Sequence, residues 1–282
     1  MKDATAALYI VATPIGNLAD ISARAIEVLS SVDIIAAEDT RHSKHLLQHH
    51  AISTATISLH EHNEQQRSEL LLTRIAHGES VALISDAGTP LISDPGFRLV
   101  TMAREQGIKV IPIPGACAVI TALSASGLSA ERFAFEGFLP AKASGRRQVL
   151  ERLQHETRTL IFYESPKRIV ASLQDMLLVF GGERRACLAR ELTKVFETLI
   201  TQPLAELVDV VSNDPNHQKG EIVLLVEGQS KVMDSDAAEV ERVLQILLAE
   251  EMPLKQAATL AASILGIKKN KAYDIALKLQ QK

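Results

Sequence analysis

The sequence contains no tryptophan and only two cysteines, and aromatic residues make up 4 % of its 282 residues. Cys117 and Cys187 lie far apart in apolar runs without CxxC spacing, which predicts free buried thiols rather than a disulfide or metal site. No apolar run reaches the roughly 18 residues of a membrane span. The N-terminal stretch has no long apolar core of a signal peptide, so we expect a cytoplasmic protein.

Several sequence motifs of common enzyme classes are also missing. No G-x-G occurs, which removes the dinucleotide fingerprint and the glycine-rich loop of the common Rossmann methyltransferases. No P-loop and no G-x-S-x-G elbow is present. The stretch HEH, residues 60–62, invites a metal site, but adjacent positions do not share a helix face and no second ligand cluster stands out. We therefore predict no metal.

The overall composition is that of an ordinary soluble globular protein, with 46 % hydrophobic and 23 % charged residues. The length permits two medium domains or one large one. The net charge of −4 excludes a polycation. Any binding to nucleic acid must therefore use a local basic patch.

Short apolar runs alternate with amphipathic helical patterns, which predicts an α/β fold with mainly parallel, doubly covered strands. Helices are expected at 20–30 and 95–107, the second with Pro95 in its first turn and Gly107 at its end. The predicted strands are 7–12, 32–37, 81–85, 109–113, 132–138, 158–163, 186–190 and 221–227.

The texture of the chain changes at two places, which predicts three domains. Near residue 131 aromatic residues begin to alternate with others, and we read 132–138 as a half-exposed antiparallel strand of a second domain. Residues 228–236 resemble a linker. The predicted domains are an N-terminal α/β domain at 1–116, a C-terminal α/β domain at 117–230 and a small helical extension at 237–282.

The extension shows no strand pattern. Helices are predicted at 237–250, 254–265 and 270–281, with Pro253 starting the second and Gly266 ending it. Its last segment is rich in lysine, including Lys268, Lys269 and Lys271. These side chains form either a solvated surface or a contact to a phosphate backbone.

Glycine-, proline- and aspartate-rich loops follow four of the predicted strands. In open α/β sheets, ligands bind outside the carboxyl ends of the strands. If the strands are parallel, the loops share one edge, and Asp39, Asp86 and Asp94 offer carboxylates there. Four such loops favour a ligand cleft over structural turns. The loops are ATPIGN (12–17), AEDTRH (37–42), DAGTPLISDPG (86–96) and PIPGACA (112–118).

A mixed-charge stretch, ARELTKVFE, occupies residues 189–197 at another predicted strand end. Its Arg190, Glu191 and Lys194 form either a surface ion pair, which stabilises little, or a group for acid–base work.

These stretches together resemble one family, the bacterial small-subunit ribosomal RNA 2′-O-ribose methyltransferases of the tetrapyrrole-methylase-like superfamily. The resemblance covers about residues 7–230, and the extension is similar to the family's C-terminal extension, although less closely. The motifs run in the family's order: LYIVATPIGNLADIS, AAEDTRHS, LISDAGTPLISDPG, PIPGACA, FEGFLP, IFYESPKRI, ARELTKVFE and KGEIVLLVEG.

The resemblance implies two α/β domains with S-adenosylmethionine in the cleft between them, and a homodimer. It implies methyl transfer to the ribose 2′-hydroxyl of a cytidine in the decoding region of 16S RNA, with the 30S subunit as the expected substrate. Two alternatives stay open: a methyltransferase of a small molecule such as a tetrapyrrole, and a non-catalytic RNA-binding protein of ribosome assembly.

The resemblance also implies site residues. The GTP sequence at 88–90 is similar to the superfamily's cofactor loop, whereas Ala116 stands where the family commonly has a proline. The expected cofactor-binding residues are Pro14, Asp86, Gly88, Thr89, Pro90, Ile92, Asp94, Ala118, Val119, Tyr163 and Ala189.

For proton transfer we expect Glu191 and Lys194, with Asp39 and Asp86 behind them. Desolvation and a nearby sulfonium would lower the pKa of Lys194 and make it a base. The predicted RNA contacts are Lys142, Arg146, Arg147, Lys167 and Arg168, together with the lysines of the extension.

Overall fold

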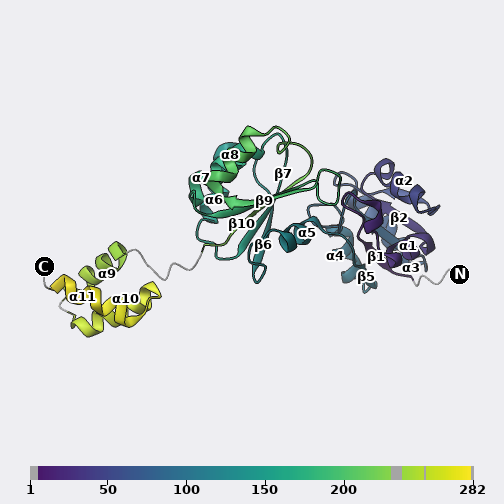
Figure 1. Cartoon of the computed structure of the whole chain (residues 1–282). Coiled ribbons are helices and arrows are strands. Elements are labelled where there is room, and N and C mark those ends of the chain that lie inside the picture. The colour runs from purple at the N-terminus through teal and green to yellow at the C-terminus, as the bar shows by residue number, and fades with distance from the viewer. Residues whose placement is uncertain (1–5, 230–236, 251, 281–282) are drawn as a thin grey trace. The chain divides into compact units, whose positions relative to one another are not determined.

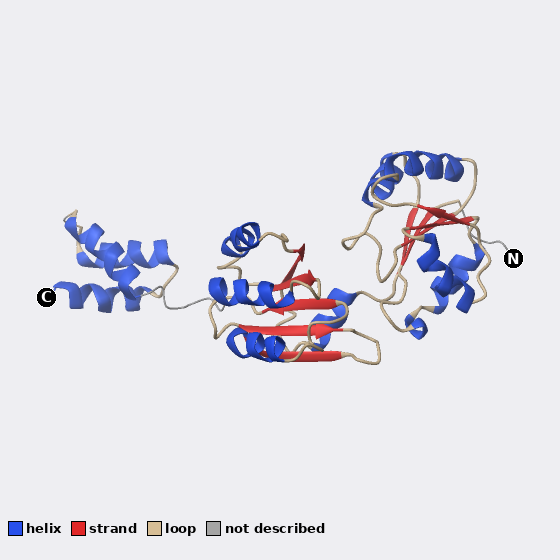
Figure 2. Ribbon diagram, turned by 90° about the horizontal axis from the view of Figure 1, so that it is seen from above, coloured by secondary structure: helices blue, strands red, loops and turns tan. Residues whose placement is uncertain are grey.

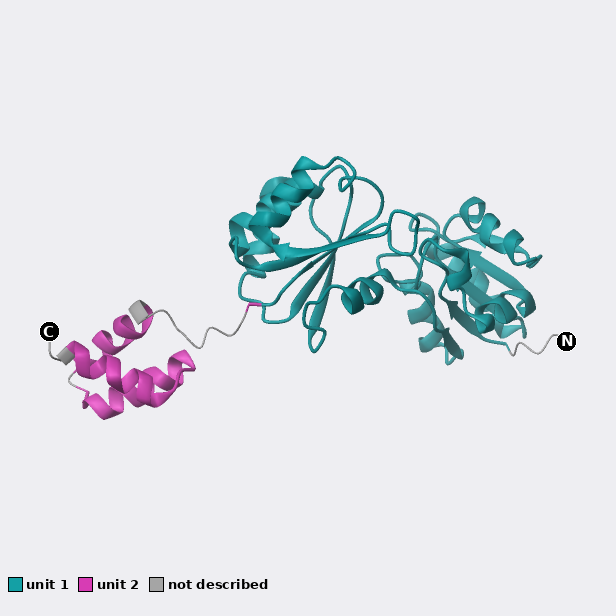
Figure 3. Ribbon diagram, in the orientation of Figure 1, with its two compact units in different colours: residues 1–228 teal, residues 229–282 magenta. Residues whose placement is uncertain are grey.

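The structure is a computed structural model that describes residues 6–229, 237–250 and 252–280. The chain forms two compact units, 1–228 and 229–282, which we call the large and the small unit (Figures 1 and 3). The predicted boundary between residues 116 and 117 lies inside the large unit and stays a prediction.

The first sheet of the large unit has the strand order β3-β2-β4-β1-β5, and all its pairs are parallel. The inner strands β2 and β4 are buried along their whole length, which explains their continuous apolar sequences. The short edge strand β3 was not predicted, because it has three residues and only partial burial. The strands are β1 (Leu8–Val11), β2 (Ile34–Ala37), β3 (Thr56–Ser58), β4 (Val81–Ile84) and β5 (Val110–Ile113).

Helices cover both faces of this sheet (Figure 2). The apolar sides of α1 (Ala23–Ser31) and α2 (Thr40–His49) pack on one face, and those of α3 (Glu64–Ala76) and α4 (Phe97–Glu105) on the other. A short 3₁₀ helix, η1 (Leu18–Asp20), precedes α1.

The prediction for α4 is wrong at its start. Gly96, in a left-handed conformation with φ of 119°, precedes the first helical residue, Phe97, so Pro95 lies outside the helix. Its end is confirmed, since Gly107 has φ of 70° directly after the cap residue.

The second sheet is mixed, with strand order β6-β7-β10-β8-β9. The antiparallel prediction for 132–138 is wrong, because β6 pairs with β7 in parallel, whereas every other pair is antiparallel. Its alternating sequence reflects an exposed edge position instead. The strands are β6 (Phe133–Phe138), β7 (Thr159–Glu164), β8 (Arg185–Arg190), β9 (Thr198–Pro203), which was not predicted, and β10 (Ile222–Val226).

The two faces of the second sheet have different covers. Helices α6 (Ala143–Arg152), α7 (Ile169–Phe180) and α8 (Leu204–Asn213) pack on one face. The other face packs against α5 (Ala118–Ala125) and Ile15, which comes from the loop after β1. One hydrophobic cluster therefore joins both halves of the large unit.

The small unit contains α9 (Ala237–Ala249), α10 (Leu254–Leu265) and α11 (Lys269–Gln280) around a core of valine, leucine and alanine. Pro253 caps α10 and Gly266 ends it in a left-handed conformation, which confirms both predictions. Most of the predicted linker, residues 230–236, lies outside the described residues.

Within the described ranges, no helix is long and apolar enough to cross a membrane. Both cysteines are free thiols; Cys187 is buried and Cys117 is half-buried.

Candidate functional site

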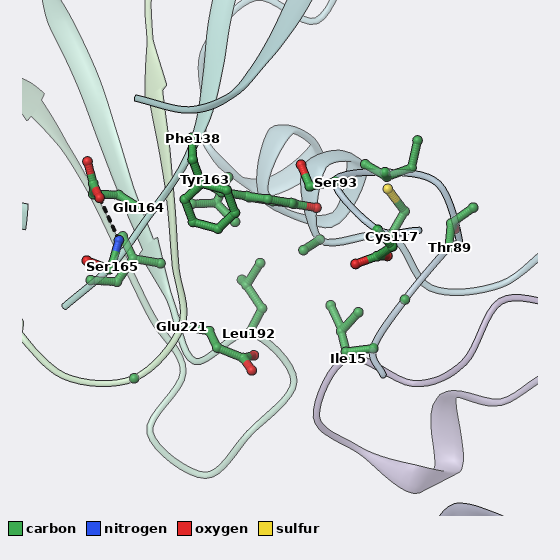
Figure 4. Close-up of a pocket in the computed structure, with 18 of the residues that line it drawn as sticks. Ile15, Thr89, Ser93, Cys117, Phe138, Tyr163, Glu164, Ser165, Leu192 and Glu221 are labelled. Carbon is green, nitrogen blue, oxygen red and sulfur yellow. Dashed lines mark hydrogen bonds between the residues drawn. The ribbon is translucent and has the colours of Figure 1, made fainter. Parts of the chain in front are cut away.

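A cavity of about 370 Å³ opens in the large unit between loops of its two halves (Figure 4). Ile15, Thr89 and Cys117 line one side, and residues of the second half, including Tyr163 and Leu192, face them. The volume lies within the range of roughly 300–1,000 Å³ for small-molecule sites. The cavity therefore occupies the edge at which the sequence predicted a ligand cleft.

The first-half wall is braced by hydrogen bonds between its loops. Thr13 N donates to the carbonyl of Gly88 at 2.9 Å, and Gly88 N donates to the carbonyl of Thr13 at 3.1 Å. Thr89 Oγ1 donates to the carbonyl of Ala116 at 3.0 Å. The loops after β1, β4 and β5 therefore form one connected wall.

The loop after β4 contains several residues with left-handed backbone. Gly88 has φ of 81°, and a Cβ there would lie 3.1 Å from Ile15 Cγ2. Leu91 and Ser93 both have φ of 72°, which is unfavourable for residues other than glycine. Such conformations are concentrated at ligand sites, where the surrounding structure enforces them.

The opposite wall is an aromatic cluster on β6 and β7. The ring of Tyr163 contacts those of Phe135 and Phe138, with centroids 4.9 and 5.6 Å apart. Burial raises the pKa of the Tyr163 hydroxyl, so it stays neutral and presents an apolar body with a polar tip.

A charged group borders the second-half wall. Lys194 Nζ donates to Glu191 Oε1 at 2.9 Å and to Glu221 Oε2 at 3.0 Å, and Glu221 lines the cavity. Burial alone would lower the pKa of Lys194, but the hydrogen bonds to both carboxylates outweigh it and raise this pKa. The predicted lowering of the Lys194 pKa is therefore wrong.

Glu191 is held in its ionised form. Burial raises its pKa, but hydrogen bonds from Glu221 N and Lys194 outweigh this effect and lower the pKa overall. Its backbone is left-handed, with φ of 51°. Neither Glu191 nor Lys194 lies on the cavity wall itself; they reach it through Glu221.

The carboxyl groups of Glu38, Asp86 and Asp94 lie near one another at the carboxyl ends of β2 and β4. Burial, followed by the charges of Glu38 and Asp86, raises the pKa of Asp94 to about 6, although a hydrogen bond with Ser85 opposes the shift. Burial and the charge of Asp86 also raise the pKa of Glu38. Of the three, Asp94 lies on the cavity wall.

Asp39 lies apart from this group. Its carboxylate caps α2 through Arg41 N at 2.8 Å and pairs with the Arg41 guanidinium at 2.7 Å. The hydrogen bonds from Arg41 hold the pKa of Asp39 well below its usual range. Its backbone N donates to Asp86 Oδ1 at 3.1 Å, so Asp86 connects the two loops.

The structure brings together about half of the predicted cofactor residues. Those on the cavity wall are Gly88, Thr89, Ile92, Asp94, Ala118 and Tyr163. Those that do not line it are Pro14, Pro90, Val119 and Ala189, which are buried behind it, and the half-buried Asp86.

Sequence reasoning missed several wall residues. It singled out no residue of the segments ESP (164–166) and GEI (220–222), although both lie in motifs that resemble the family. Leu192 and Cys117 were missed because apolar residues in a loop carry no chemical signal of their own. The tertiary contact of the two halves was needed to find them.

The predicted basic residues differ in how free their charges are. Lys142 and Lys167 are exposed. Arg146 is buried, with its guanidinium 2.6 Å from Asp175, and Arg147 binds the same carboxylate at 2.6 Å while half of its side chain stays exposed. Arg168 pairs with Glu164 at 2.8 Å.

The three lysines predicted as RNA contacts in the small unit lie at or directly before the start of α11. Lys268 and Lys269 are exposed, and Lys271 is half-buried. No group of three or more metal-ligating side chains that could hold an ion occurs within the described ranges.

Comparison with known proteins shows which family the chain belongs to. The profile of the Tetrapyrrole (Corrin/Porphyrin) Methylases matches residues 7–208, and that of the RsmI C-terminal HTH domain matches residues 234–280. The ribosomal RNA small subunit methyltransferase I of Pseudomonas aeruginosa is 59 % identical over 98 % of both chains. The chain belongs to this methyltransferase family. The protein of the same name from Escherichia coli O157:H7 is 56 % identical over 97 % of this chain and 95 % of its own.

Solved structures confirm the fold of this methyltransferase. The cobalt precorrin-4 methyltransferase of cobalamin biosynthesis is 14 % identical, with a TM-score of 0.58 over 78 % of this chain and 94 % of its own. Uroporphyrin-III C-methyltransferase from Thermus thermophilus, solved with S-adenosyl homocysteine, is 16 % identical, with a TM-score of 0.55 over 79 % and 97 %. The predicted α/β fold of the tetrapyrrole-methylase type, followed by a small helical C-terminal extension, is thus confirmed.

Proposed function

We propose that this protein transfers the methyl group of S-adenosylmethionine to the ribose 2′-hydroxyl of a cytidine in the decoding region of 16S rRNA, on the 30S subunit. The observation that carries the proposal is the cavity at the edge of the parallel sheet, in a chain 59 % identical to a ribosomal RNA small subunit methyltransferase I. Resemblance to the family supports a homodimer in the cytoplasm as part of the proposal.

The residues of the cavity fit S-adenosylmethionine. Gly88 has no side chain, which lets a ligand approach the backbone of this loop closely. Ile15, Leu192 and Tyr163 give an apolar enclosure, and Asp94 and Glu221 supply charge at its rim. Bound there, the cofactor would supply an already activated methyl group.

In this proposal the protein aligns the ribose and removes one proton. Alignment of the reacting groups contributes up to roughly 7–11 kcal/mol in favourable cases. We assign proton acceptance to Asp94, because its carboxyl lies on the cavity wall and its pKa of about 6 suits a base near neutral pH. A positioned base adds roughly 10²- to 10⁴-fold.

Glu191 and Lys194 receive a positioning role instead of the predicted base role. Lys194 is protonated, so it cannot accept the 2′-hydroxyl proton. Its ammonium fixes Glu221 on the cavity wall through a 3.0 Å hydrogen bond. Asp39 caps α2 through its carboxylate and donates its backbone N–H to Asp86. These two contacts hold the loop after β2, which also carries Glu38.

For the RNA, we propose contacts from cations of both units: the exposed Lys142, Arg147 and Lys167, and the exposed Lys268 and Lys269 with the half-buried Lys271 of the small unit. Arg146 and Arg168 were predicted as contacts from sequence, but both are ion-paired, the buried Arg146 with Asp175 and the half-buried Arg168 with Glu164. In this proposal they position the neighbouring basic residues and do not bind phosphates.

The test is transfer of labelled methyl from S-adenosylmethionine to naked 16S RNA, to 30S subunits without the modification and to modified 30S subunits. Label in ribose on unmodified 30S subunits alone supports the proposal. Label on no acceptor despite cofactor binding favours a small-molecule methyltransferase. Absence of cofactor binding leaves a non-catalytic RNA-binding protein.

A further inference from the structure

A second cavity, of about 460 Å³, lies beside the first. Its walls come from the loops after β2, β3 and β4, and they include Glu38, His60 and Phe97. Carboxyl ends of parallel strands share one edge of the sheet, which is why residues so distant in sequence meet here.

The two cavities share the wall residues Ser93 and Asp94. Ser93 has a left-handed backbone with φ of 72°, so the shared segment is held in a conformation that a free loop would avoid. Because Asp94 belongs to both walls, a nucleotide whose ribose lies beside Asp94 would extend its base into the second cavity.

Phe97 offers this base a fixed aromatic surface. The residue is 74 % exposed, although large aromatic residues are normally buried to a high degree. Glu64 fixes the backbone on both sides of Phe97, since Glu64 Oε1 accepts from Gly96 N at 3.0 Å and from Arg98 N at 2.9 Å. Stacking on an aromatic ring contributes to the binding of unpaired bases.

The polar wall includes several carboxyl groups, those of Glu38, Glu61, Glu64 and Asp94, and the ring of His60. Glu38 is a half-buried carboxyl group. Asn63 Oδ1 accepts from the backbone N of His60 at 2.9 Å, so Asn63 Nδ2 faces His60 Nε2 at 3.1 Å and donates to it. The ring proton of His60 then belongs on Nδ1, which is buried and has no hydrogen-bond partner within the described ranges.

We propose that this second cavity receives the base of the target cytidine, with Phe97 stacking on the ring and Glu38 accepting from the exocyclic amino group. Carboxylates are the usual acceptors for cytosine N4. Uracil carries an oxygen at that position, which a carboxylate repels. The inference rests on the proposed function and names the substrate contacts of the same site.

The test uses the full-length protein and 30S subunits reconstituted with cytidine or with uridine at the nucleotide that the native enzyme methylates. The variants are Glu38→Gln and Phe97→Ala, with Glu105→Gln as a control, because Glu105 is exposed on α4 and lines neither cavity. Initial rates give kcat/KM for each subunit, and calorimetry gives the affinity for S-adenosylmethionine.

Glu38→Gln, whose amide both donates and accepts, should lower the cytidine-to-uridine ratio of kcat/KM by about tenfold or more. Phe97→Ala should raise KM about tenfold on either subunit and leave cofactor affinity unchanged, whereas Phe97→Tyr should retain the native KM. Glu105→Gln should match the native enzyme.

An unchanged ratio in Glu38→Gln, or an unchanged KM in Phe97→Ala, would overturn the base pocket while the proposed function stands. If the native protein binds S-adenosylmethionine but methylates no 30S subunit, the proposed function fails and the base pocket falls with it. The native control thus separates the two failures.

Discussion

A methyl group added to Gly16 would lie 2.5 Å from Cγ of Lys194, so the loop after β1 rests directly on the loop after β8. The same added atom would lie 2.8 Å from Thr193 Oγ1 and 2.9 Å from the carbonyl oxygen of Leu192. Only glycine permits so close an approach. This contact brings Ile15 and Leu192 to the same cavity.

Gly16→Ala should therefore separate the two loops. Because a backbone carbonyl is among the clashing atoms, we expect a loss of about 1–3 kcal/mol in the free energy of unfolding, as in other overpacked sites. Cofactor affinity should fall as well. Gly182→Ala is the control, since its nearest atom would be Ala205 Cβ at 3.3 Å, outside the cavity. Chemical denaturation and calorimetry measure both; native affinity in Gly16→Ala contradicts the prediction.

Gly88→Ala should weaken cofactor binding more than it weakens the fold. An alanine at φ of 81° is strained by about 1–2 kcal/mol, and its Cβ would press on Ile15. Gly107→Ala is matched for strain, with φ of 70° and nothing within 4 Å of the added atom. Both variants should lose similar stability, but only Gly88→Ala should lose affinity for S-adenosylmethionine. Equal affinities would remove Gly88 from the cofactor site.

The proposed role of Asp94 predicts a pH-dependent rate. With a pKa of about 6, its carboxyl is protonated and inactive as a base below that pH, and ionised above it. The kcat/KM for 30S subunits should therefore rise tenfold per pH unit below about pH 6 and level off above it. Asp94→Asn should lower the rate roughly 10²- to 10⁴-fold and abolish this acidic limb. A retained limb in the variant assigns the titration to another group.

The same group predicts a stability change with pH. Between its ordinary pKa of 3.8 and about 6, Asp94 keeps its proton in the folded protein but releases it in the unfolded chain. The folded state binds more protons in that window, so stability falls as pH rises through it. Asp94→Asn removes this contribution. Its melting temperature relative to the native protein should increase from pH 4 to pH 7; a constant difference would refute the raised pKa.

The buried ion pair Arg146–Asp175 should contribute to the stability of the fold. Both side chains are 5 % exposed, and loss of one partner of a buried pair costs about 3–5 kcal/mol. Asp175→Ala, which leaves two guanidiniums without their carboxylate, should therefore be strongly destabilised in urea. Stability close to native would show that the pair is dispensable.

Arg147→Ala should instead act on RNA. Half of its side chain is exposed, so removal should weaken 30S binding and reduce the salt slope by about 0.7–0.9 for one lost phosphate contact. Lys109→Ala, at an exposed position before β5, is the control for a lost charge. Binding titrations at several salt concentrations measure the slope; an unchanged slope excludes Arg147 from the interface.

The sequence alone was sufficient for most of the parallel sheet and for the small unit. Strands buried on both faces are continuous apolar runs, as in Val81–Ile84, and helix ends follow local backbone rules, as at Gly266. Short or partly exposed strands such as β3 and β9 carry too few apolar residues to be recognised. The parallel pairing of β6 was missed because alternation reports exposure and not strand direction.

The site divides in the same way. The glycine and aspartate loops at strand ends were visible in the sequence, because parallel strands put their carboxyl ends at one edge. The state of Lys194 was not visible, because two carboxylates from different segments, Glu191 and Glu221, decide its pKa. The raised pKa of Asp94 likewise depends on burial and on Glu38 from another loop. Local patterning determined where a ligand could bind; only long-range packing, which sets desolvation and charge neighbours, decided which side chains line the cavity and how they ionise.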